Sequence, residues 1–497
     1  MTRRTNNRAA GGEALSRPRR NAGRRKPQPA RLQRQTFRTS REMDFFTEKE
    51  LERQTGHEIE EWPLVAVKEL ADNGLDACEE AGVAPVVSVA AGPGGISVSD
   101  NGPGLPEETL AGALDFTVRA SSREAYVSPC RGAQGHALKT IIPMPTVVDP
   151  EGGRFVLEAR GKRHAIACRA DPISQRAVFH DDGEARPTTG TTAGLAWTPR
   201  QDDRMGVIWP FNDLLPLVTY DWDDTPTPAE CFRELLEGYA LFNPHATVRL
   251  DWFGETTTWE ATDPGWQKWQ PYQPPSAHWY EEEHLARQVG AYVTSDRENG
   301  ADRLVSDFLA DFDGFSGSGK RTRVLNDTGL KRARLSALVK GDRLDMERVG
   351  LLLKAMREHS KPVQSRRLGV IGEEHFRRRL LAMGVRPESF RYRRRLAKSK
   401  NCEAEDGEKA SLLPWVLESA FGYLGQGAKE RRRIYLGANW SAAIKNPFRA
   451  FGSAEGLEAL LTGRRVGQAE PVVFALHLAH PRIQYLDRGK STVGGLS

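Results

Sequence analysis

Apolar and polar positions recur along this chain with two different periods, which predict helices and strands in separate segments. Apolar residues spaced three or four apart in 47–56 and 62–82 predict two helices that end at Gly56 and Gly82. The short apolar runs within 86–104 instead predict two strands around a glycine-rich turn. The N-terminal part of the chain therefore combines helices with strands.

The alternation of helices and strands continues downstream. Helical spacing is found in 107–116 and 131–142, and strand-like runs are found in 153–161 and 191–199. With glycine-rich connections between them, these segments predict an α/β layered domain that ends near residue 255.

The pattern changes after that domain. A Trp- and Pro-rich stretch at 259–280 predicts a linker or extended strap, and the pattern to about residue 400 is helical and basic. A break at 401–414 then opens a last α/β segment. In this last segment we expect strands within 431–440 and 471–487 and a helix at 454–463 between them.

Composition narrows the class of protein. With 39% hydrophobic and 28% charged residues among 497, the chain is ordinary for a soluble protein. It has no run of about 18 apolar residues to span a membrane, and its N-terminus lacks the apolar core of a secretory signal. Five scattered cysteines without a CxxC pair argue against a disulfide framework and a structural zinc site. We therefore expect a cytoplasmic protein.

The formal net charge of +5 conceals a strongly basic N-terminus. Residues 1–41 contain thirteen Lys or Arg and one acid, a net charge of +12, which leaves −7 on the rest of the chain. Because this tail has few large apolar side chains, we expect it to be disordered. It can hold nucleic-acid phosphates by counterion release, or it can be a solvated tail, and the sequence leaves both alternatives open.

The helix predicted over 62–82 carries more polar chemistry than a core helix needs. Glu69 and Asn73 are four residues apart and so share one face, while Leu70 and Leu75 supply packing surface. An amide oxygen can bind Mg²⁺, and a carboxylate can orient and deprotonate a water, so the pair suits nucleotide hydrolysis. Taken alone, such a pair is more often a solvated helix face.

A second candidate motif follows the strand at 96–100. Asp100 can accept a hydrogen bond from an exocyclic amine such as that of adenine, and Gly102 and Gly104 let the backbone pass close to a base. Taken alone, a DxGxG sequence is more often an ordinary turn.

The third candidate motif is RGAQGHALKT, residues 131–140. Gly132 and Gly135 precede a helix predicted to begin near His136, so the free backbone N–H groups of its first turn form a cradle for an anion. The segment lacks the GxxxxGK[ST] pattern of a P-loop.

In order and spacing, the three motifs together resemble those of the GHKL ATPases, whose Bergerat fold is shared by gyrase B, Hsp90, MutL and sensor histidine kinases. The resemblance implies a Bergerat-type α/β sandwich that binds ATP and Mg²⁺. It implies that Glu69 is the general base and Asn73 the Mg²⁺ ligand. It also implies that Asp100 binds the adenine amine and that Gly102 and Gly104 border the base.

The same resemblance implies further ATP-binding residues. Thr191 lies near the adenine and Asp100, and Asp76 either contacts the ligand or makes a local hydrogen bond. Ala137 replaces a glycine found in many members, so we expect a stiffer lid. Ser121 and Ser122 are also assigned to the site. The lid over the phosphates comprises Arg131, Gly132, Ala133, Gln134, Gly135, His136 and Ala137.

Within this family, the chain resembles the B-type ATPase component of DNA topoisomerase VI and its bacterial relatives. The segments ELADNGLDACEEAG and SSREAYVSPCRGAQGHALKTI are similar to that branch's motifs, and VVFALHLAHPRIQYLDRGKST is similar to its transducer domain. The implied parts are a basic tail (1–41), an ATP-binding domain (42–255), a linker with a helical, helix–two-turns–helix-like region (256–400), and an α/β transducer-like domain of the ribosomal S5 domain 2 type (401–497).

This branch implies an ATP-dependent homodimer that clamps DNA, with Lys490 as the loop lysine that contacts the γ-phosphate. A topoisomerase VI A-like (Toprim) cleaving protein is the implied partner. The chain ends seven residues after Lys490, where the topoisomerase VI ATPase component continues into a long helix that docks its partner. Strand passage therefore stays open, and a stand-alone GHKL scaffold or signalling protein is the alternative.

Three other patterns have ordinary interpretations. Residues 314–322 imitate a P-loop, but Arg321 replaces the Ser or Thr that binds Mg²⁺, so we expect a loop. His477 and His480 lack further metal ligands and are expected to be structural. The Arg runs at 377–379, 393–395 and 431–433 can be phosphate-binding ridges, solvated faces or partners of nearby acids.

Overall fold

The computed structural model describes residues 45–116, 126–131, 137–171, 173–174, 176–217, 226–396, 413–425, 431–449, 456–485 and 493–495. The chain divides into two units, Met1–Thr39 and Ser40–Ser497, and every described residue lies in the second. Several predicted features therefore lie outside the described residues: the basic tail, Ser121, Ser122, residues 132–136 and Lys490.

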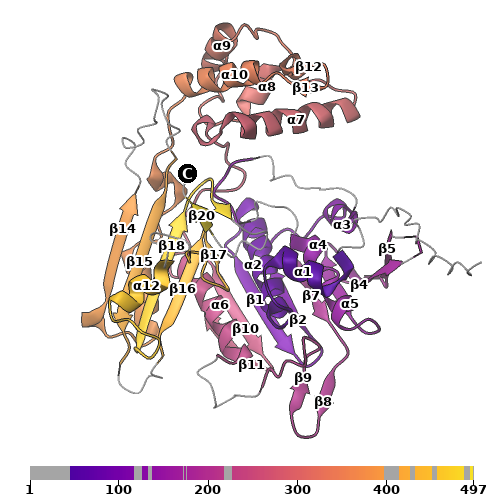
Figure 1. Cartoon of the computed structure of the whole chain (residues 1–497), viewed down its shortest axis with the longest axis vertical. Helices are drawn as coiled ribbons and strands as arrows, with labels where there is room; N and C mark the ends of the chain where they lie inside the picture. The colour runs from indigo at the N-terminus through magenta and orange to yellow at the C-terminus, as the bar shows by residue number, and fades with distance from the viewer. Residues whose placement is uncertain are drawn as a thin grey trace, which may run out of the picture. The chain divides into compact units, whose positions relative to one another are not determined.

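A nine-stranded sheet is the largest element of the fold (Figure 1). Its strands run in the order β11-β10-β1-β2-β7-β3-β4-β5, with β6 beside β4, and β1 and β10 are parallel. The strands predicted from the sequence are confirmed, and the sheet continues past residue 255 to Trp259. The strands are β1 (Val86–Gly92), β2 (Gly95–Asp100), β3 (Arg154–Ala159), β4 (Lys162–Asp171), β5 (Arg176–Asp181), β6 (Glu184–Ala185), β7 (Thr191–Ala196), β10 (Thr247–Trp252) and β11 (Glu255–Trp259).

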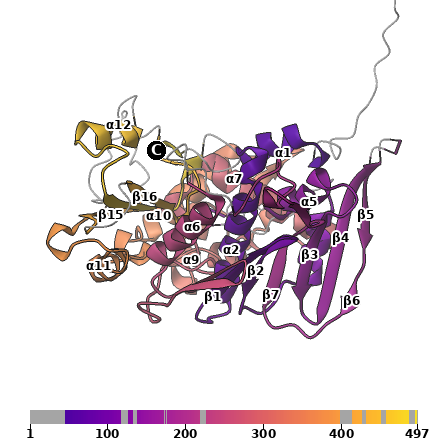
Figure 2. The same ribbon diagram turned by 90° about the horizontal axis from the view of Figure 1, so that it is seen from below.

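The helix α2 (Trp62–Glu80) covers the middle of this sheet and packs on β1, β2 and β7 (Figure 2). Pro63 occupies its first turn, where a missing N–H costs nothing, and Gly82 follows its end with a φ of +69°. The predicted start and stop signals are therefore confirmed. Beside α2, the helix α6 (Pro228–Phe242) packs on β10 and begins with a Thr227–Glu230 capping box.

Smaller elements complete this part of the chain. The helices predicted at 47–56 and 107–116 are confirmed as α1 and α3, and the helix predicted near His136 begins at Ala137. These elements are α1 (Glu48–Thr55), η2 (Ile59–Glu61), α3 (Glu107–Leu114), α4 (Ala137–Ile141), α5 (Met144–Val148), β8 (Arg200–Asp202) and β9 (Gly206–Ile208).

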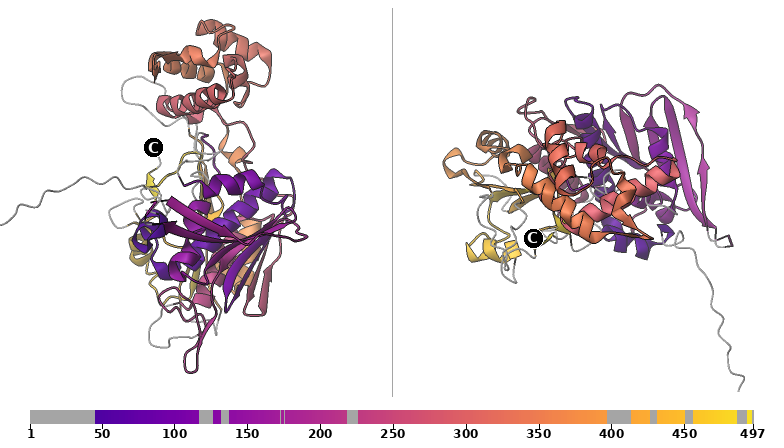
Figure 3. Two further views of the ribbon diagram at one scale, coloured as in Figure 1. Left: turned by 90° about the vertical axis from the view of Figure 1, so that its right-hand side faces the viewer. Right: turned by 90° about the horizontal axis from the view of Figure 1, so that it is seen from above.

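A helical segment follows the strap, as the sequence predicts. Figure 3 shows α7 to α10, coloured rose to orange, packed together as a group, and α10 contacts both α7 and α9. The helix α11 lies apart from this group and contacts α6, β14 (Arg391–Leu396) and β15 (Val416–Tyr423). The elements are η3 (Ala277–Trp279), α7 (Glu282–Glu298), α8 (Val305–Ala310), α9 (Ser318–Asp327), η4 (Leu335–Leu338), β12 (Val339–Lys340), β13 (Arg343–Leu344), α10 (Met346–His359), η5 (Ser365–Leu368), α11 (Glu373–Ala382) and η6 (Pro387–Ser389).

The P-loop-like sequence at 314–322 forms a loop in its first part and the beginning of a helix in its second part. Residues 314–317 are non-helical, but α9 begins at Ser318, so the prediction of a loop is wrong for the second half. The reason is tertiary: Val324 and Leu325, beyond the motif, are buried in the core and draw the preceding polar residues into the helix.

A second sheet has five strands in the order β14-β15-β18-β16-β17. The expectation of helix up to residue 400 is wrong for β14 (Arg391–Leu396), which pairs antiparallel with β15 along six residues. In β14, Tyr392 reaches Glu418 of β15, a cross-strand contact that the dense arginine pattern did not indicate. The remaining elements are β15 (Val416–Tyr423), β16 (Arg433–Ala438), β17 (Ser441–Ala442), α12 (Gly456–Gly463), β18 (Val472–Ala479), β19 (Gln484–Tyr485) and β20 (Val493–Gly495).

The predicted α/β class is confirmed by these two sheets and their helices. Most buried apolar side chains form one core that extends from α1 through both sheets, and a smaller core lies between the five-stranded sheet and α12. Within the part of the chain that the structure describes, no helix has the length and apolarity needed to cross a membrane.

Candidate functional site

One face of α2 is more open than the rest of the helix. From Val65 to Glu79, every residue is buried except Glu69, Asn73 and Ala77, which are partly exposed. These three are spaced by four residues, so they form a single stripe along the helix. The carboxylate and the amide expected to act on a nucleotide therefore lie on the one side of α2 that a ligand can reach.

Asp100, at the end of β2, lies against the same helix. A Cβ atom on Gly74 would come 3.1 Å from the Cβ of Asp100, so a glycine next to Asn73 allows the approach. Oδ1 of Asp100 accepts hydrogen bonds from the backbone N–H of Gly102 at 2.8 Å and of Thr191 at 3.3 Å. Burial raises the pKa of the Asp100 carboxyl, and these hydrogen bonds only partly oppose it.

The loop before β7 approaches the same carboxylate residue. Gly190 has a φ of +70°, and a Cβ there would come 1.9 Å from the carbonyl oxygen of Asp100. The Thr191 hydroxyl accepts a hydrogen bond from the N–H of Leu105 at 3.1 Å, which ties this loop to the turn after Gly104. The structure thus brings Asp100, Gly102 and Thr191 together as the sequence resemblance implies. Gly190 was missed, although its place between Thr189 and Thr191 is typical of a tight turn.

Asp76 and Arg131 lie together, but in a buried cluster rather than on the open stripe. The guanidinium of Arg131 donates to Asp76 at 2.8 Å and to Glu79 at 2.9 Å. Glu79 also accepts from Lys268 at 2.7 Å and lies 3.0 Å from His245. Burial would raise the pKa of Glu79, but Arg131 and Lys268 outweigh it and hold this pKa well below its ordinary value.

This cluster holds Arg131, the first residue of the expected lid, in a fixed position. The Arg131 guanidinium donates to Asp76 and Glu79 of α2, to Asn243 after α6 and to the carbonyl of Trp440. Residues 132–136 lie outside the described residues, and Ala137 is the first residue of α4. Sequence reasoning missed Glu79 and Lys268. The spacing of Asp76 and Glu79 on one helical turn was a signal for the first, but nothing local indicates that Lys268 of the strap joins them.

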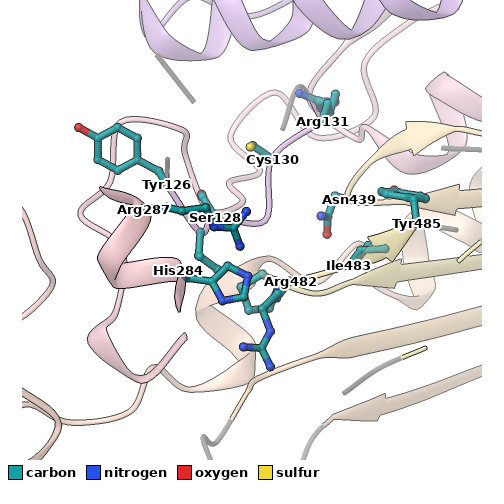
Figure 4. A pocket seen from close by; sticks show the side chains of 12 residues that line it. Tyr126, Ser128, Cys130, Arg131, His284, Arg287, Asn439, Arg482, Ile483 and Tyr485 are labelled. Atoms are coloured by element: carbon teal, nitrogen blue, oxygen red, sulfur yellow. The ribbon is translucent and has the colours of Figure 1, made fainter. Parts of the chain in front are cut away.

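A cavity of about 220 Å³ lies where the segment before the lid meets α7 and the end of the second sheet. Figure 4 shows His284 and Arg287 of α7 on one side of it and Asn439 and Tyr485 on the other. Desolvation raises the pKa of Tyr485, and the charges of Lys68, Asp72 and Glu69 also act on its hydroxyl. Tyr485 is therefore the lining residue that connects this cavity electrostatically with Glu69.

Metal binding was predicted for a single residue, Asn73. Among the residues that the structure describes, no group of three or more His, Cys, Asp or Glu side chains is arranged to hold a metal ion. His477 and His480 are buried, and Nε2 of His477 accepts a hydrogen bond from the N–H of Trp440 at 3.0 Å, which is a structural role. The donors on α2 suit an ion that takes most of its ligands from phosphate and water.

Comparison with known proteins bears on this arrangement. No protein-family model matches the chain. A stretch of 83 residues is 36% identical to the B-type component of the type 2 DNA topoisomerase 6 of Archaeoglobus fulgidus. The match covers 16% of this chain and only 14% of that protein. The similarity to this archaeal protein is therefore confined to a short stretch of the chain.

Three solved structures also align with the chain at low identity. The 43K ATPase domain of Thermus thermophilus gyrase B, in complex with an aminocoumarin, is 12% identical over 86% of this chain and 78% of its own, with a TM-score of 0.29. The Aquifex aeolicus MutL ATPase domain, complexed with ADP, is 14% identical over 84% and 90%, with a TM-score of 0.29. The N-terminal domain of a DNA repair protein is 12% identical over 87% and 91%, with a TM-score of 0.34.

Proposed function

We propose that this chain is an ATPase of the GHKL type and that Glu69 activates the attacking water. The observation that carries the proposal is the partly exposed stripe of Glu69 and Asn73 on α2, with Asp100 packed against the adjacent Gly74. On an otherwise buried helix, an apolar pair would pack better than a carboxylate and an amide four residues apart. Packing therefore does not explain why these two polar residues are there.

Each group then has a chemical task. Asp100 accepts a hydrogen bond from the adenine amine, and the backbone at Gly102 and Gly104 lies along the base. Glu69 orients a water and takes its proton as the water oxygen bonds to the γ-phosphorus. The bond from that phosphorus to the β–γ bridging oxygen breaks, and the oxygen leaves with ADP. Asn73 offers an amide oxygen to Mg²⁺, whose charge, when bound, offsets that of the phosphate oxygens. Thr191 and the lid up to Ala137, with Ser121 and Ser122, complete the nucleotide-binding part of the proposal. Asp76 and Arg131 are buried against each other, so in this proposal they hold α2 and the start of the lid in place instead of contacting the ligand.

The finer proposal is an ATP-gated clamp like the ATPase component of topoisomerase VI. Two chains dimerise when ATP binds, hydrolysis releases them, and Lys490 reports the γ-phosphate to the five-stranded sheet. Support comes from the sequence resemblance and from the 36% identity over 83 residues to the archaeal topoisomerase 6 component. DNA is the proposed substrate, and a Toprim-type cleaving protein is the proposed partner.

The arginine runs differ in their suitability for DNA. Arg431 pairs with Glu234, and Arg432 pairs with Glu458 at 2.6 Å, so that run is used within the fold. Arg393, Arg394 and Arg395 of β14 are exposed, and no ion pair among the described residues engages them. The β14 run is therefore the surface that we propose for contact with DNA phosphates.

The ATPase proposal is tested with Glu69→Ala in the full chain. We expect this variant to bind ATP with an affinity close to that of the unaltered protein and to lose at least about 100-fold in turnover, because a positioned general base contributes that much. Binding and phosphate release are measured on the same preparation. Unchanged turnover in the variant would remove Glu69 from the mechanism.

A further inference from the structure

Lys68 is a buried cation next to the proposed base. Its Nζ lies 3.1 Å from Oε1 of Glu69 and 3.1 Å from Oδ2 of Asp72, and the Lys68 and Asp72 side chains are only 10% and 1% exposed. Burial alone would lower the pKa of Lys68, but Asp72 and then Glu69 outweigh it and raise this pKa well above its ordinary value. The ammonium is therefore charged and shared between two carboxylates.

Asp72 in turn connects α2 with two other elements. Its Oδ1 accepts a hydrogen bond from the Tyr239 hydroxyl of α6 at 2.7 Å, and its Oδ2 accepts one from the Ser441 hydroxyl of β17 at 2.7 Å. Ser441 belongs to the five-stranded sheet, 369 residues away along the chain. The oxygen that receives Ser441 is the same oxygen that holds Lys68.

We propose that Lys68 is a positioning residue for Glu69, and that Ser441 couples this pair to the five-stranded sheet through Asp72. The inference rests on the proposed ATPase function and deepens it, because it names the groups that set the state of the base. It uses neither Lys490 nor the lid, and therefore describes a second connection between the sheet and the hydrolytic residue.

The electrostatic reason follows from the sharing of one ammonium. A positive charge within about 4–6 Å favours the ionised form of a carboxylate, which is the form a general base needs. When Ser441 donates to Asp72, Asp72 depends less on Lys68, and Lys68 is freer to hold Glu69. When the five-stranded sheet withdraws Ser441, Lys68 is drawn toward Asp72 and Glu69 loses that support.

The charged and titratable groups near Glu69 come from several elements. Lys68 and Asp72 lie on α2, and Tyr485 of β19 interacts electrostatically with Glu69, Lys68 and Asp72. From α6, Tyr239 faces Asp72 and Lys68. Burial raises the pKa values of both tyrosines, so neither titrates in the acid range where Glu69 is tested.

The first test is the pH dependence of kcat for Lys68→Met, which keeps the length of the side chain and removes its charge. Without the ammonium the pKa of Glu69 rises, so activity on the acid side must begin at a higher pH. We expect the acid limb to move upward by about one pH unit. Because Lys68 also holds the Glu69 carboxylate in position, we expect kcat at neutral pH to fall about tenfold. KM for ATP should change little, and Lys68→Arg should restore much of the loss.

The second test uses Ser441→Ala. This change removes only a hydroxyl group, so we expect the variant to fold even if the loss of the buried charge in Lys68→Met prevents that variant from folding. It should move the acid limb in the same upward direction by a smaller amount, and Ser441→Thr should restore the original profile because it keeps the hydroxyl. Lys445→Met is the matched control. Lys445 follows β17 and forms an ion pair at 2.6 Å with Glu61, which directly precedes α2. The change removes this ion pair and leaves the contacts of Asp72 in place.

The outcomes separate this inference from the proposed function. An acid limb that moves in Ser441→Ala, and in Lys68→Met where that variant folds, but not in Lys445→Met, supports the coupling. A limb that moves in Lys68→Met and stays in place in Ser441→Ala overturns the part played by Ser441. An acid limb that stays in place in every folded variant, while Glu69→Ala abolishes turnover, overturns the coupling and leaves the ATPase intact. Absence of ATP turnover in the unaltered chain overturns both.

Discussion

Gly190 shows how closely single residues determine the proposed adenine end of the site. Gly190 has a φ of +70°, which favours glycine. A Cβ atom at this position would lie 1.9 Å from the carbonyl oxygen of Asp100. The two hydrogen bonds that fix the Asp100 carboxylate come from Gly102 and from Thr191, the neighbour of Gly190. A change at Gly190 must therefore move either β2 or the start of β7.

For Gly190→Ala we expect a loss of about 2 kcal/mol or more in the free energy of unfolding, from backbone strain and the close contact. ATP affinity should fall at least about tenfold, because a loss of about 1.4 kcal/mol in binding free energy is enough for that change. Urea denaturation and equilibrium binding of an ATP analogue measure the two effects. Gly206→Ala is the control: it has a φ of +79° but nothing within 4 Å of its Cβ, so it should cost stability and leave affinity unchanged.

The side chains on α2 also show what could be predicted for single residues. The shared face of Glu69 and Asn73 follows from helical spacing, and the structure places both on the exposed stripe. Which way Asp76 points does not follow from spacing, because its partner Arg131 comes from 55 residues further along the chain. The burial of two charged residues, Lys68 and Asp72, is likewise understandable only from the hydrogen bonds that Tyr239 and Ser441 donate to Asp72. Nothing in the sequence indicates that these two residues lie near α2.

At the scale of elements, β18 contributes a buried histidine to the junction between the sheets. Burial, with a smaller contribution from Arg131, lowers the pKa of His477 to about 3. Its Nε2 accepts a hydrogen bond from the N–H of Trp440, in the turn between β16 and β17. The neutral imidazole is therefore part of the structure that carries Ser441.

This arrangement predicts a dependence of stability on pH. In the unfolded chain His477 takes up a proton below about pH 6.5, whereas in the folded chain it does so only near pH 3. The free energy of unfolding therefore falls as the pH drops from about 6.5 to about 3. His477→Gln, which keeps an acceptor, should reduce the slope by about 1.4 kcal/mol per pH unit between pH 6 and 4. Urea denaturation at several pH values measures it.

His180→Gln is the control for that experiment, because His180 is exposed on β5 and should leave the slope as it is. An equal slope in the unaltered protein and in His477→Gln would mean that His477 is accessible to protons in the folded state.

Elements with local signals were predictable, and those set by distant contacts were not. The caps and periodicity of α1 and α2 and the turn between β1 and β2 are local features, and all four elements are where the sequence puts them. The helix start of α9 and the strand β14 depend on burial of Val324 and Leu325 and on pairing with β15. Neither dependence is visible in the residues that form the element.

At the scale of the whole molecule, the proposed clamp requires a surface for DNA, and β14 offers exposed arginines. Arg393 and Arg395 lie two residues apart on a strand and so face the same side. Changing both to alanine should weaken binding to duplex DNA and lower the slope of log K against log salt by about 2, since each phosphate contact contributes about 0.9. Fluorescence anisotropy over a range of salt measures both.

Arg431→Ala is the matched control, because its guanidinium already pairs with Glu234. It should leave the salt slope as it is. If the β14 double variant keeps the slope of the unaltered protein, then β14 is a solvated edge, and the DNA part of the proposal has to rest on another surface.

The central claim is that the exposed stripe of α2 hydrolyses ATP through Glu69. Its most direct measurement is the rate of phosphate release per bound nucleotide at saturating Mg²⁺-ATP, for the unaltered chain and for Glu69→Gln, which keeps the shape of the side chain. We predict measurable turnover in the first and a loss of at least about 100-fold in the second, with equal nucleotide occupancy. Equal rates in the two proteins, or no nucleotide bound to either, would contradict the account.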